Sequence, residues 1–166
     1  MSRGFVKEDD QEEIPIVPPR ADLPEGVTNY VTQVGMNELL TEKETLVNEK
    51  NNLDSSNEDE KRIALNYINA KLQLLNDRIV TAKIENLNNQ APDEIRFGAV
   101  IKLKIEANKS IQTFQIVGVD EADISKGKIS FTSPLAKELI NKKNGDKAIL
   151  KRGQEHLVFE ILEIAY

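Results

Sequence analysis

Apolar residues recur at steps of three and four positions along two stretches in the first half of the chain. Such steps place apolar side chains on one face of an α-helix, and the alternation of four and three is typical of a two-helix seam. The apolar positions are Met36, Leu39, Leu40, Leu46, Val47 and Leu53, and then Leu65, Ile68, Leu72, Leu75, Ile79, Ala82 and Ile84. The pattern predicts that residues 30–90 form an antiparallel coiled-coil hairpin, helical from Val31 onwards.

The segment between the two stretches reads NLDSSNEDEKR and is acidic. Its four carboxylates belong to Asp54, Glu58, Asp59 and Glu60. Ser55 and Ser56 each precede an acid by three positions, which is the spacing of a capping box at the start of a helix. A first helix of about 19 residues is about 30 Å long. We therefore expect a short rod with an acidic tip near residues 54–60.

Beyond residue 95 the apolar period drops to two, which is typical of β-strands. The strand-like segments are AVIKLKIEA, IQTFQIVGV, GKISF, KAIL and HLVFEILEI. A helix interrupts them, with Ser133 as its expected N-cap, Pro134 in its first turn and Gly145 at its end. Residues 95–166 are predicted to form a mainly antiparallel sheet with one short helix, so the fold class is α+β.

Residues 1–29 differ in composition from the rest of the chain. They hold four of the six prolines and the charged run KEDDQEE, without apolar periodicity. This composition predicts a flexible arm, because it offers little apolar surface to bury. The alternative is that IPIVPPR serves as a docking segment.

The lack of cysteine excludes thiolate nucleophiles, zinc–thiolate sites and disulfides. The 166 residues include no cysteine and one histidine, His156, which stands in strand-like alternation and is interpreted as a strand residue.

The net charge is −6, with seven acids and three bases in residues 1–29, ten and seven in 30–90, and eleven and twelve in 91–166. Without clustered bases, we expect contact with nucleic acid only through another protein. No apolar run reaches the roughly 20 residues of a membrane span, so a cytoplasmic protein without membrane contact is expected.

The C-terminal half resembles a known family over nearly all of residues 95–166. The segments RFGAVIKL, FQIVGVDEADISKGKIS, SFTSPLAKELINKKNGD and FEILEIAY are similar to the C-terminal domain of the bacterial GreA and GreB transcript-cleavage factors. That domain has an FKBP-like fold and follows an antiparallel coiled coil. The opening residues are similar to leaders of some GreB-like proteins. Glu138 stands where the family usually has a small residue.

The resemblance implies a transcription elongation regulator that binds RNA polymerase as a monomer. Gre factors insert their coiled coil into the polymerase's secondary channel, where acidic tip residues help to hold a second Mg²⁺ and backtracked RNA is cleaved. The protein would then be no enzyme by itself and have no cofactor of its own. The resemblance assigns the cleavage-assisting role to Asp54, Glu58 and Asp59, and the shared Mg²⁺ to Asp54 and Glu58. It assigns polymerase contacts to Asp120, Glu121, Ser133, Pro134 and Leu135.

The tip departs from the family pattern D-x-x-E-N-x-E-Y. Asp54 and Glu58 are four positions apart, and Asn57 precedes Glu58 where the family's Asn follows its Glu. The coiled coil is also short. The alternative is therefore a channel binder or competitor without cleavage activity, similar to the Rnk-type relatives. A third alternative, a prolyl isomerase, is disfavoured because five Phe, three Tyr and no Trp leave few aromatic residues for a proline pocket.

Overall fold

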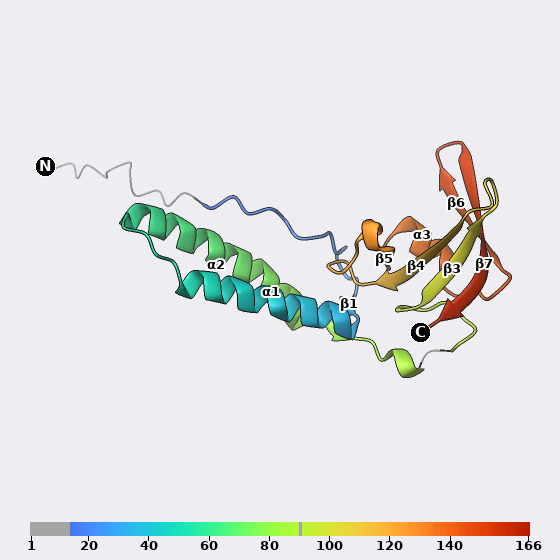
Figure 1. Cartoon of the computed structure of the whole chain (residues 1–166), viewed down its shortest axis with the longest axis horizontal. Coiled ribbons are helices and arrows are strands. Elements are labelled where there is room, and N and C mark those ends of the chain that lie inside the picture. The colour runs from blue at the N-terminus through green and yellow to red at the C-terminus, as the bar shows by residue number, and fades with distance from the viewer. Residues whose placement is uncertain (1–13, 90) are drawn as a thin grey trace, which may run out of the picture.

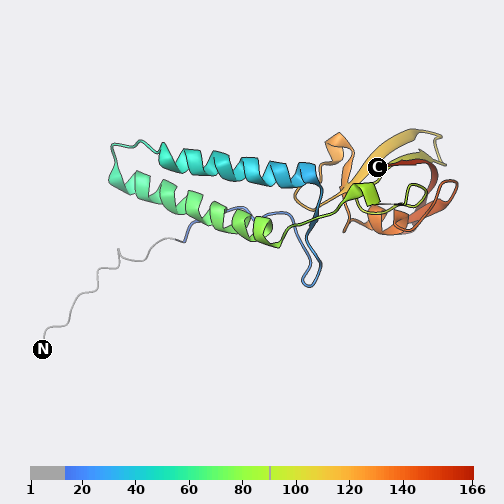
Figure 2. The same ribbon diagram turned by 90° about the horizontal axis from the view of Figure 1, so that it is seen from below.

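The computed structural model describes residues 14–89 and 91–166, which form a helical hairpin and a sheet domain (Figure 1). The hairpin consists of α1 (Gln33–Asn51) and α2 (Glu58–Thr81). It projects from the sheet domain as a rod whose connecting turn lies at the far end (Figures 1 and 2). None of the helices in the described part of the chain has the length and apolar character needed to cross a membrane. The predicted α+β class, with a helical hairpin before the sheet, is confirmed.

The hairpin has a narrow apolar seam between its two helices. The buried residues are Val31, Leu39, Leu46, Ile68 and Leu75. Each fully buried Leu or Ile contributes about 1.5–3 kcal/mol to stability. Leu40 and Val47, counted in the predicted stripe, are instead 45% and 36% exposed. Successive residues point about 100° apart around a helix, so Leu39 and Leu40 cannot both face the partner helix.

A short pair of parallel strands closes the base of the hairpin. β1 (Tyr30–Val31) pairs with β2 (Lys83–Ile84). The prediction that Val31 and Ile84 belong to the helices was wrong, because backbone hydrogen bonds between the segment before α1 and the segment after α2 replace the helical ones there. Lys83 N donates to Asn29 O at 2.8 Å, and Glu85 N donates to Val31 O at 3.1 Å.

The sheet domain contains the five strands that the sequence predicts. They are β3 (Val100–Ile105), β4 (Ile111–Val117), β5 (Lys128–Ser130), β6 (Lys147–Arg152) and β7 (Glu155–Ala165). Their order is β5-β4-β3-β7-β6, and every pair is antiparallel except β4 with β5. His156 lies exposed on β7, as expected for a strand residue.

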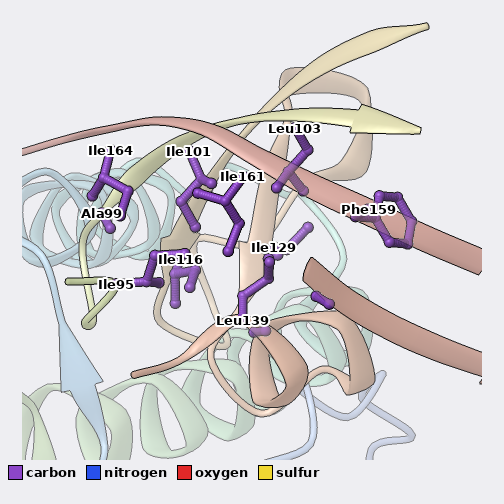
Figure 3. Packing of buried hydrophobic residues seen from close by; sticks show 12 residues of the cluster. Ile95, Ala99, Ile101, Leu103, Ile116, Ile129, Leu139, Phe159, Ile161 and Ile164 are labelled. Atoms are coloured by element: carbon purple, nitrogen blue, oxygen red, sulfur yellow. The ribbon is translucent and has the colours of Figure 1, made fainter. Parts of the chain in front are cut away.

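One face of the sheet carries the core, together with α3 (Pro134–Leu139). Figure 3 shows Leu139 of α3 directed towards the strand residues Ile116, Ile129 and Ile161. All four side chains are at most 3% exposed. The domain that carries Asp120 and Ser133 therefore has a packed core of its own.

The start of α3 is predicted correctly, but its end is not. Ser133 is the N-cap and Pro134 the first helical residue, whereas the helix ends at Leu139 instead of near Gly145. Asn141 adopts a left-handed conformation with φ of 71°, and its N–H donates to Ile95 O at 2.9 Å. Pairing with the segment around Ile95 therefore takes the backbone away from the helix before Gly145 is reached.

Candidate functional site

The acidic tip lies at the far end of the hairpin. Asp54 is in the turn that precedes α2, and the first turn of α2 contains Glu58, Asp59 and Glu60. All four residues are exposed. Carboxylates in the first turn of a helix interact favourably with its positive end, by roughly 0.3–1 kcal/mol each. Three of the four acids therefore have a structural reason to be where they are.

The cap of α2 is Asn57, not the predicted Ser55 or Ser56. Asn57 Oδ1 accepts hydrogen bonds from Asp59 N at 3.0 Å and Glu60 N at 3.4 Å. Asn caps a helix as well as Ser does, and the extended backbone of Asn57 suits the N-cap position. Ser55 supports the turn instead, since its Oγ accepts from Asn57 N at 3.1 Å.

The tip does not form a metal site on its own. Within residues 14–89 and 91–166, no group of three or more Asp, Glu or His side chains is arranged to hold a metal ion. Asp59 lies 3.7 Å from Arg62 in an exposed ion pair. The carboxylates of Asp54 and Glu58 are hard oxygen ligands of the kind that Mg²⁺ takes, commonly one or two per ion. They suit a Mg²⁺ ion that another macromolecule also holds, so the shared-metal role stays a prediction.

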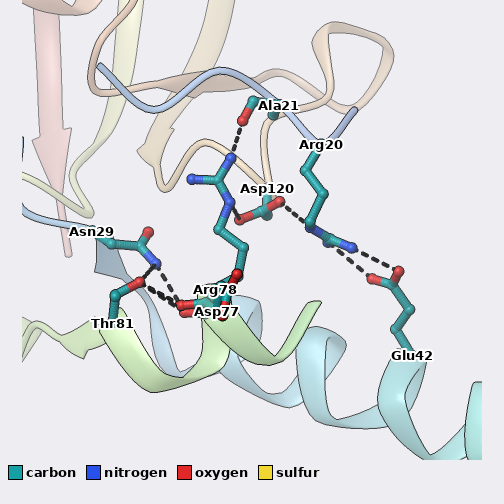
Figure 4. Close-up of polar contacts among 8 residues, drawn as sticks. All are labelled: Arg20, Ala21, Asn29, Glu42, Asp77, Arg78, Thr81 and Asp120. Atoms are coloured by element: carbon teal, nitrogen blue, oxygen red, sulfur yellow. Dashed lines mark hydrogen bonds and ion pairs between the residues drawn. The ribbon is translucent and has the colours of Figure 1, made fainter. Parts of the chain in front are cut away.

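A second polar cluster lies where the hairpin meets the sheet domain (Figure 4). Its centre is Asp120, whose side chain is 8% exposed. Arg20 Nε donates to Asp120 Oδ1 at 3.0 Å, and Arg78 Nε lies 3.3 Å from Asp120 Oδ2. Asp120 was predicted to face a partner. In this structure it holds one guanidinium from the N-terminal segment and one from α2.

Arg20 extends the cluster to α1. Its two terminal nitrogens donate to both carboxylate oxygens of Glu42, at 2.8 and 3.0 Å. The hydrogen bonds that Arg20 donates to Glu42 raise the pKa of Arg20, and the charge of Asp120 adds to this effect against the opposing effect of burial. Paired forks of this kind are among the strongest ion pairs in proteins. Arg20 is therefore a permanent cation between two carboxylates.

Glu121 is also turned inwards. Its side chain is 3% exposed and accepts hydrogen bonds from Thr32 Oγ1 at 2.6 Å and Lys128 Nζ at 3.1 Å. Thr32 is the N-cap of α1 and accepts from Gly35 N at 3.0 Å. The carboxylate thus lies beside the positive end of α1, a position that favours a negative charge.

The remaining predicted contact residues lie at the start of α3. Ser133 Oγ accepts from Ala136 N at 3.3 Å, Leu135 is half-buried against the core, and Pro134 is exposed. Of the five predicted polymerase contacts, only Pro134 therefore has an exposed side chain in this structure. The partner-binding roles stay predictions, and Asp120 and Glu121 carry an internal role besides.

The sequence offered no signal for Arg20, Arg78 and Glu42 as a cluster. Arg20 and Asp120 are 100 positions apart, and no local spacing links them. A second junction contact was equally hidden, since Tyr30, Phe97 and Phe131 form a triangle with ring centroids 5.7–5.9 Å apart. Only the folded arrangement brings these side chains together.

Comparison with known proteins identifies the C-terminal domain. The family described as "Transcription elongation factor, GreA/GreB, C-term" matches residues 89–166. The chain is 39% identical over 100 residues to a protein named transcription elongation factor GreA from Pelobacter propionicus, covering 60% of this chain and 63% of that one. It is 37% identical over 103 residues to the protein of the same name from Bartonella henselae, covering 62% and 66%. The match therefore spans just under two thirds of these relatives.

Two solved structures of similar proteins match most of this chain. One is the GreA factor homologue Gfh1 of Thermus thermophilus, with 20% identity, a TM-score of 0.40, and coverage of 84% of this chain and all of that one. The other is GreA/GreB from Nitrosomonas europaea, with 17% identity, a TM-score of 0.42, and coverage of 82% and 98%.

Sequence similarity and the matched domain agree with the resemblance found in the segments from RFGAVIKL to FEILEIAY. Residues 89–166 therefore belong to the family of GreA/GreB C-terminal domains, which is found in transcription elongation factors.

Proposed function

We propose that this protein regulates transcription elongation by binding bacterial RNA polymerase in the cytoplasm. The C-terminal domain docks on the polymerase, and the hairpin enters the secondary channel with its tip first. The observation that carries the proposal is the combination of a GreA/GreB C-terminal domain with a projecting helical hairpin whose far end is acidic and exposed. Nucleic acid is then reached only through the polymerase complex.

Occupation of the channel without RNA cleavage is the version that the geometry favours. The 19 residues of α1 span about 28 Å, so the tip lies only about that far from the base of the hairpin. Glu58, Asp59 and Glu60 stabilise the start of α2, so their presence at the tip is explained without a metal ion. A plug at this place would hinder backtracked RNA or other channel-binding factors.

Assistance to cleavage is the second candidate, and a specific observation favours it. Asp54 and Glu58 are exposed and have no hydrogen bond or ion pair with the described residues, so both carboxylates are available to an ion. Together with Asp59 they would help to hold a Mg²⁺ ion at the polymerase active site. That ion would supply charge stabilisation and an activated water for phosphodiester hydrolysis. The protein itself would remain a co-factor and not an enzyme.

An RNA-cleavage assay with a stalled, backtracked polymerase complex distinguishes the two versions of the proposal. Channel occupation predicts binding without release of short 3′ RNA fragments at any Mg²⁺ concentration. Fragment release that disappears in the Asp54→Asn/Glu58→Gln/Asp59→Asn variant, and persists in a Glu44→Gln control on the exposed side of α1, would establish cleavage assistance instead. Absence of binding to polymerase would refute both versions.

A further inference from the structure

The N-terminal segment of residues 17–23 follows α2 towards the junction with the sheet domain (Figures 1 and 2). It carries no regular secondary structure, yet its side chains contact three other parts of the molecule. Arg20 bridges Glu42 on α1 and Asp120 in the loop after β4. A segment held in this way differs from a loose leader.

The contacts from α2 complete the arrangement. Arg78 on α2 donates to Ala21 O and also pairs with Asp120 (Figure 4). The side chains of Arg20, Arg78 and Asp120 are 19%, 14% and 8% exposed. The two cations are paired with the buried carboxylate of Asp120 and with that of Glu42, which is 41% exposed at the edge of the cluster. Loss of a partner inside the cluster leaves a largely buried charge unpaired.

Apolar side chains and prolines of the same segment lie next to α2. Val17, Pro19 and Leu23 line a hollow together with Leu74 of α2, and Tyr67 lines the adjoining hollow next to Pro18. Proline restricts the backbone before folding, so less conformational entropy is lost when the segment is ordered. The segment therefore has a preformed shape as well as charged anchors.

We infer that residues 17–23 act as an intramolecular strap that fixes the hairpin in one orientation to the sheet domain, with Arg20 as its positioning residue. The strap contacts the hairpin farther from its base than the other junction contacts do. Thr32 and Tyr30 hold the hairpin at its base, whereas Glu42 lies ten positions further along α1, about 15 Å from Thr32. A contact at that distance from the base resists swinging of the rod more strongly than contacts at the base do.

The strap concerns the shape of the protein alone and does not depend on the proposed function. Its test is the distance from hairpin to sheet domain, measured without polymerase. Because the chain has no cysteine, Gln73→Cys on α2 and Gln154→Cys in the β6–β7 turn provide unique sites for spin labels. Both residues are exposed, and neither belongs to the strap or its contacts. Pulsed electron spin resonance then gives the distribution of distances between them.

We expect one narrow distribution for the labelled parent protein. Arg20→Ala is expected to broaden it at least twofold or to add a second distance, since the link between α1 and Asp120 is lost. Glu42→Gln is expected to act in the same direction, because it removes one charge but keeps the shape of the side chain. Arg62→Ala, which affects only the exposed pair with Asp59 at the tip, is the matched control.

The outcomes differ clearly. A distribution that stays as narrow in Arg20→Ala and Glu42→Gln as in the parent and in Arg62→Ala overturns the strap. Circular dichroism of each variant verifies that the helices remain folded, and Glu42→Gln keeps the inference testable should Arg20→Ala fail to fold. Broadening in both strap variants, with unchanged helix content, supports it.

Discussion

Thr32 and Glu121 are 89 positions apart in sequence, yet Thr32 Oγ1 donates to Glu121 Oε2 at 2.6 Å. The same hydroxyl accepts from Gly35 N and so caps α1. One buried side chain therefore both starts the hairpin and joins it to the sheet domain. Such pairs join the base of the hairpin to the sheet domain, far from the acidic tip.

Replacement of Thr32 tests this relationship. Thr32→Ala removes the cap and leaves the buried carboxylate of Glu121 with one partner fewer, so we expect a loss of about 2–3 kcal/mol in the free energy of unfolding. Urea unfolding followed by circular dichroism measures it. Thr45→Ala, at an exposed threonine in the middle of α1, should change the same quantity by less than about 0.5 kcal/mol. Equal effects of the two substitutions would contradict the assigned role.

Close approach of two backbones at the junction gives a second prediction. A Cβ atom at Gly118 would lie 2.6 Å from Tyr30 O, and this backbone atom cannot move without shifting β1. We expect Gly118→Ala to destabilise the protein by about 1–3 kcal/mol or more. Thermal unfolding should show a fall in melting temperature of at least several degrees.

Gly26→Ala is the control for this substitution. Its Cβ would meet nothing within 4 Å, although the φ of +78° leaves a strain of about 1–2 kcal/mol. The two variants therefore separate steric contact from backbone strain. A smaller loss for Gly118→Ala than for Gly26→Ala would mean that the junction is not tightly packed.

The helical hairpin was predictable because its apolar residues repeat locally. Leu39, Leu46, Ile68 and Leu75 follow the helical period, and all four are buried in the seam. Asn57 at the tip shows the limit of local patterns, because several residues in SSN suit the cap and only the structure shows which one the helix follows.

Contacts between segments that are far apart in sequence determine the features that the sequence pattern did not predict. α3 ends at Leu139 because the backbone after it pairs with the segment around Ile95, some 45 positions earlier. The resemblance assigned Asp120 to contacts with polymerase, whereas its partners in the structure, Arg20 and Arg78, come from two distant segments. The spacing of residues along the sequence does not predict such contacts.

The cap of α2 gives a third prediction. Asn57→Ala removes the acceptor of two backbone N–H groups and should lower the free energy of unfolding by about 1 kcal/mol. Ser56→Ala, at the position that the capping-box spacing also favoured, should have a negligible effect. Urea unfolding of both variants distinguishes them, and a larger effect at Ser56 would restore the original interpretation of the turn.

Tyr166 gives the protein a defined response to alkaline pH. Its hydroxyl donates to Glu94 O and accepts from Arg96 N, which ties the last residue to the start of the sheet domain. Burial raises the pKa of Tyr166 above its ordinary value, against the opposing hydrogen bond from Arg96. The resulting stabilisation is complete below the unfolded-state pKa of about 10 and is lost as pH rises through the higher folded-state pKa.

Unfolding by urea at a series of pH values, from about 9 to 12, measures this loss. In Tyr166→Phe the part of the decline that is due to this hydroxyl should disappear, and stability at neutral pH should fall because two hydrogen bonds are missing. Identical alkaline profiles for the parent and for Tyr166→Phe would show that the hydroxyl is not held as described.

Insertion of the proposed kind, with the hairpin inside the secondary channel of RNA polymerase, can be detected by crosslinking from the tip. A photoreactive amino acid at Ser56, which is exposed beside the four carboxylates, is irradiated in a complex with a stalled elongation complex. If the hairpin is inserted, crosslinks form to polymerase segments that line the channel, and they are lost when an excess of unlabelled protein competes. Crosslinks confined to the outer surface of polymerase, or no stable complex at all, would contradict it.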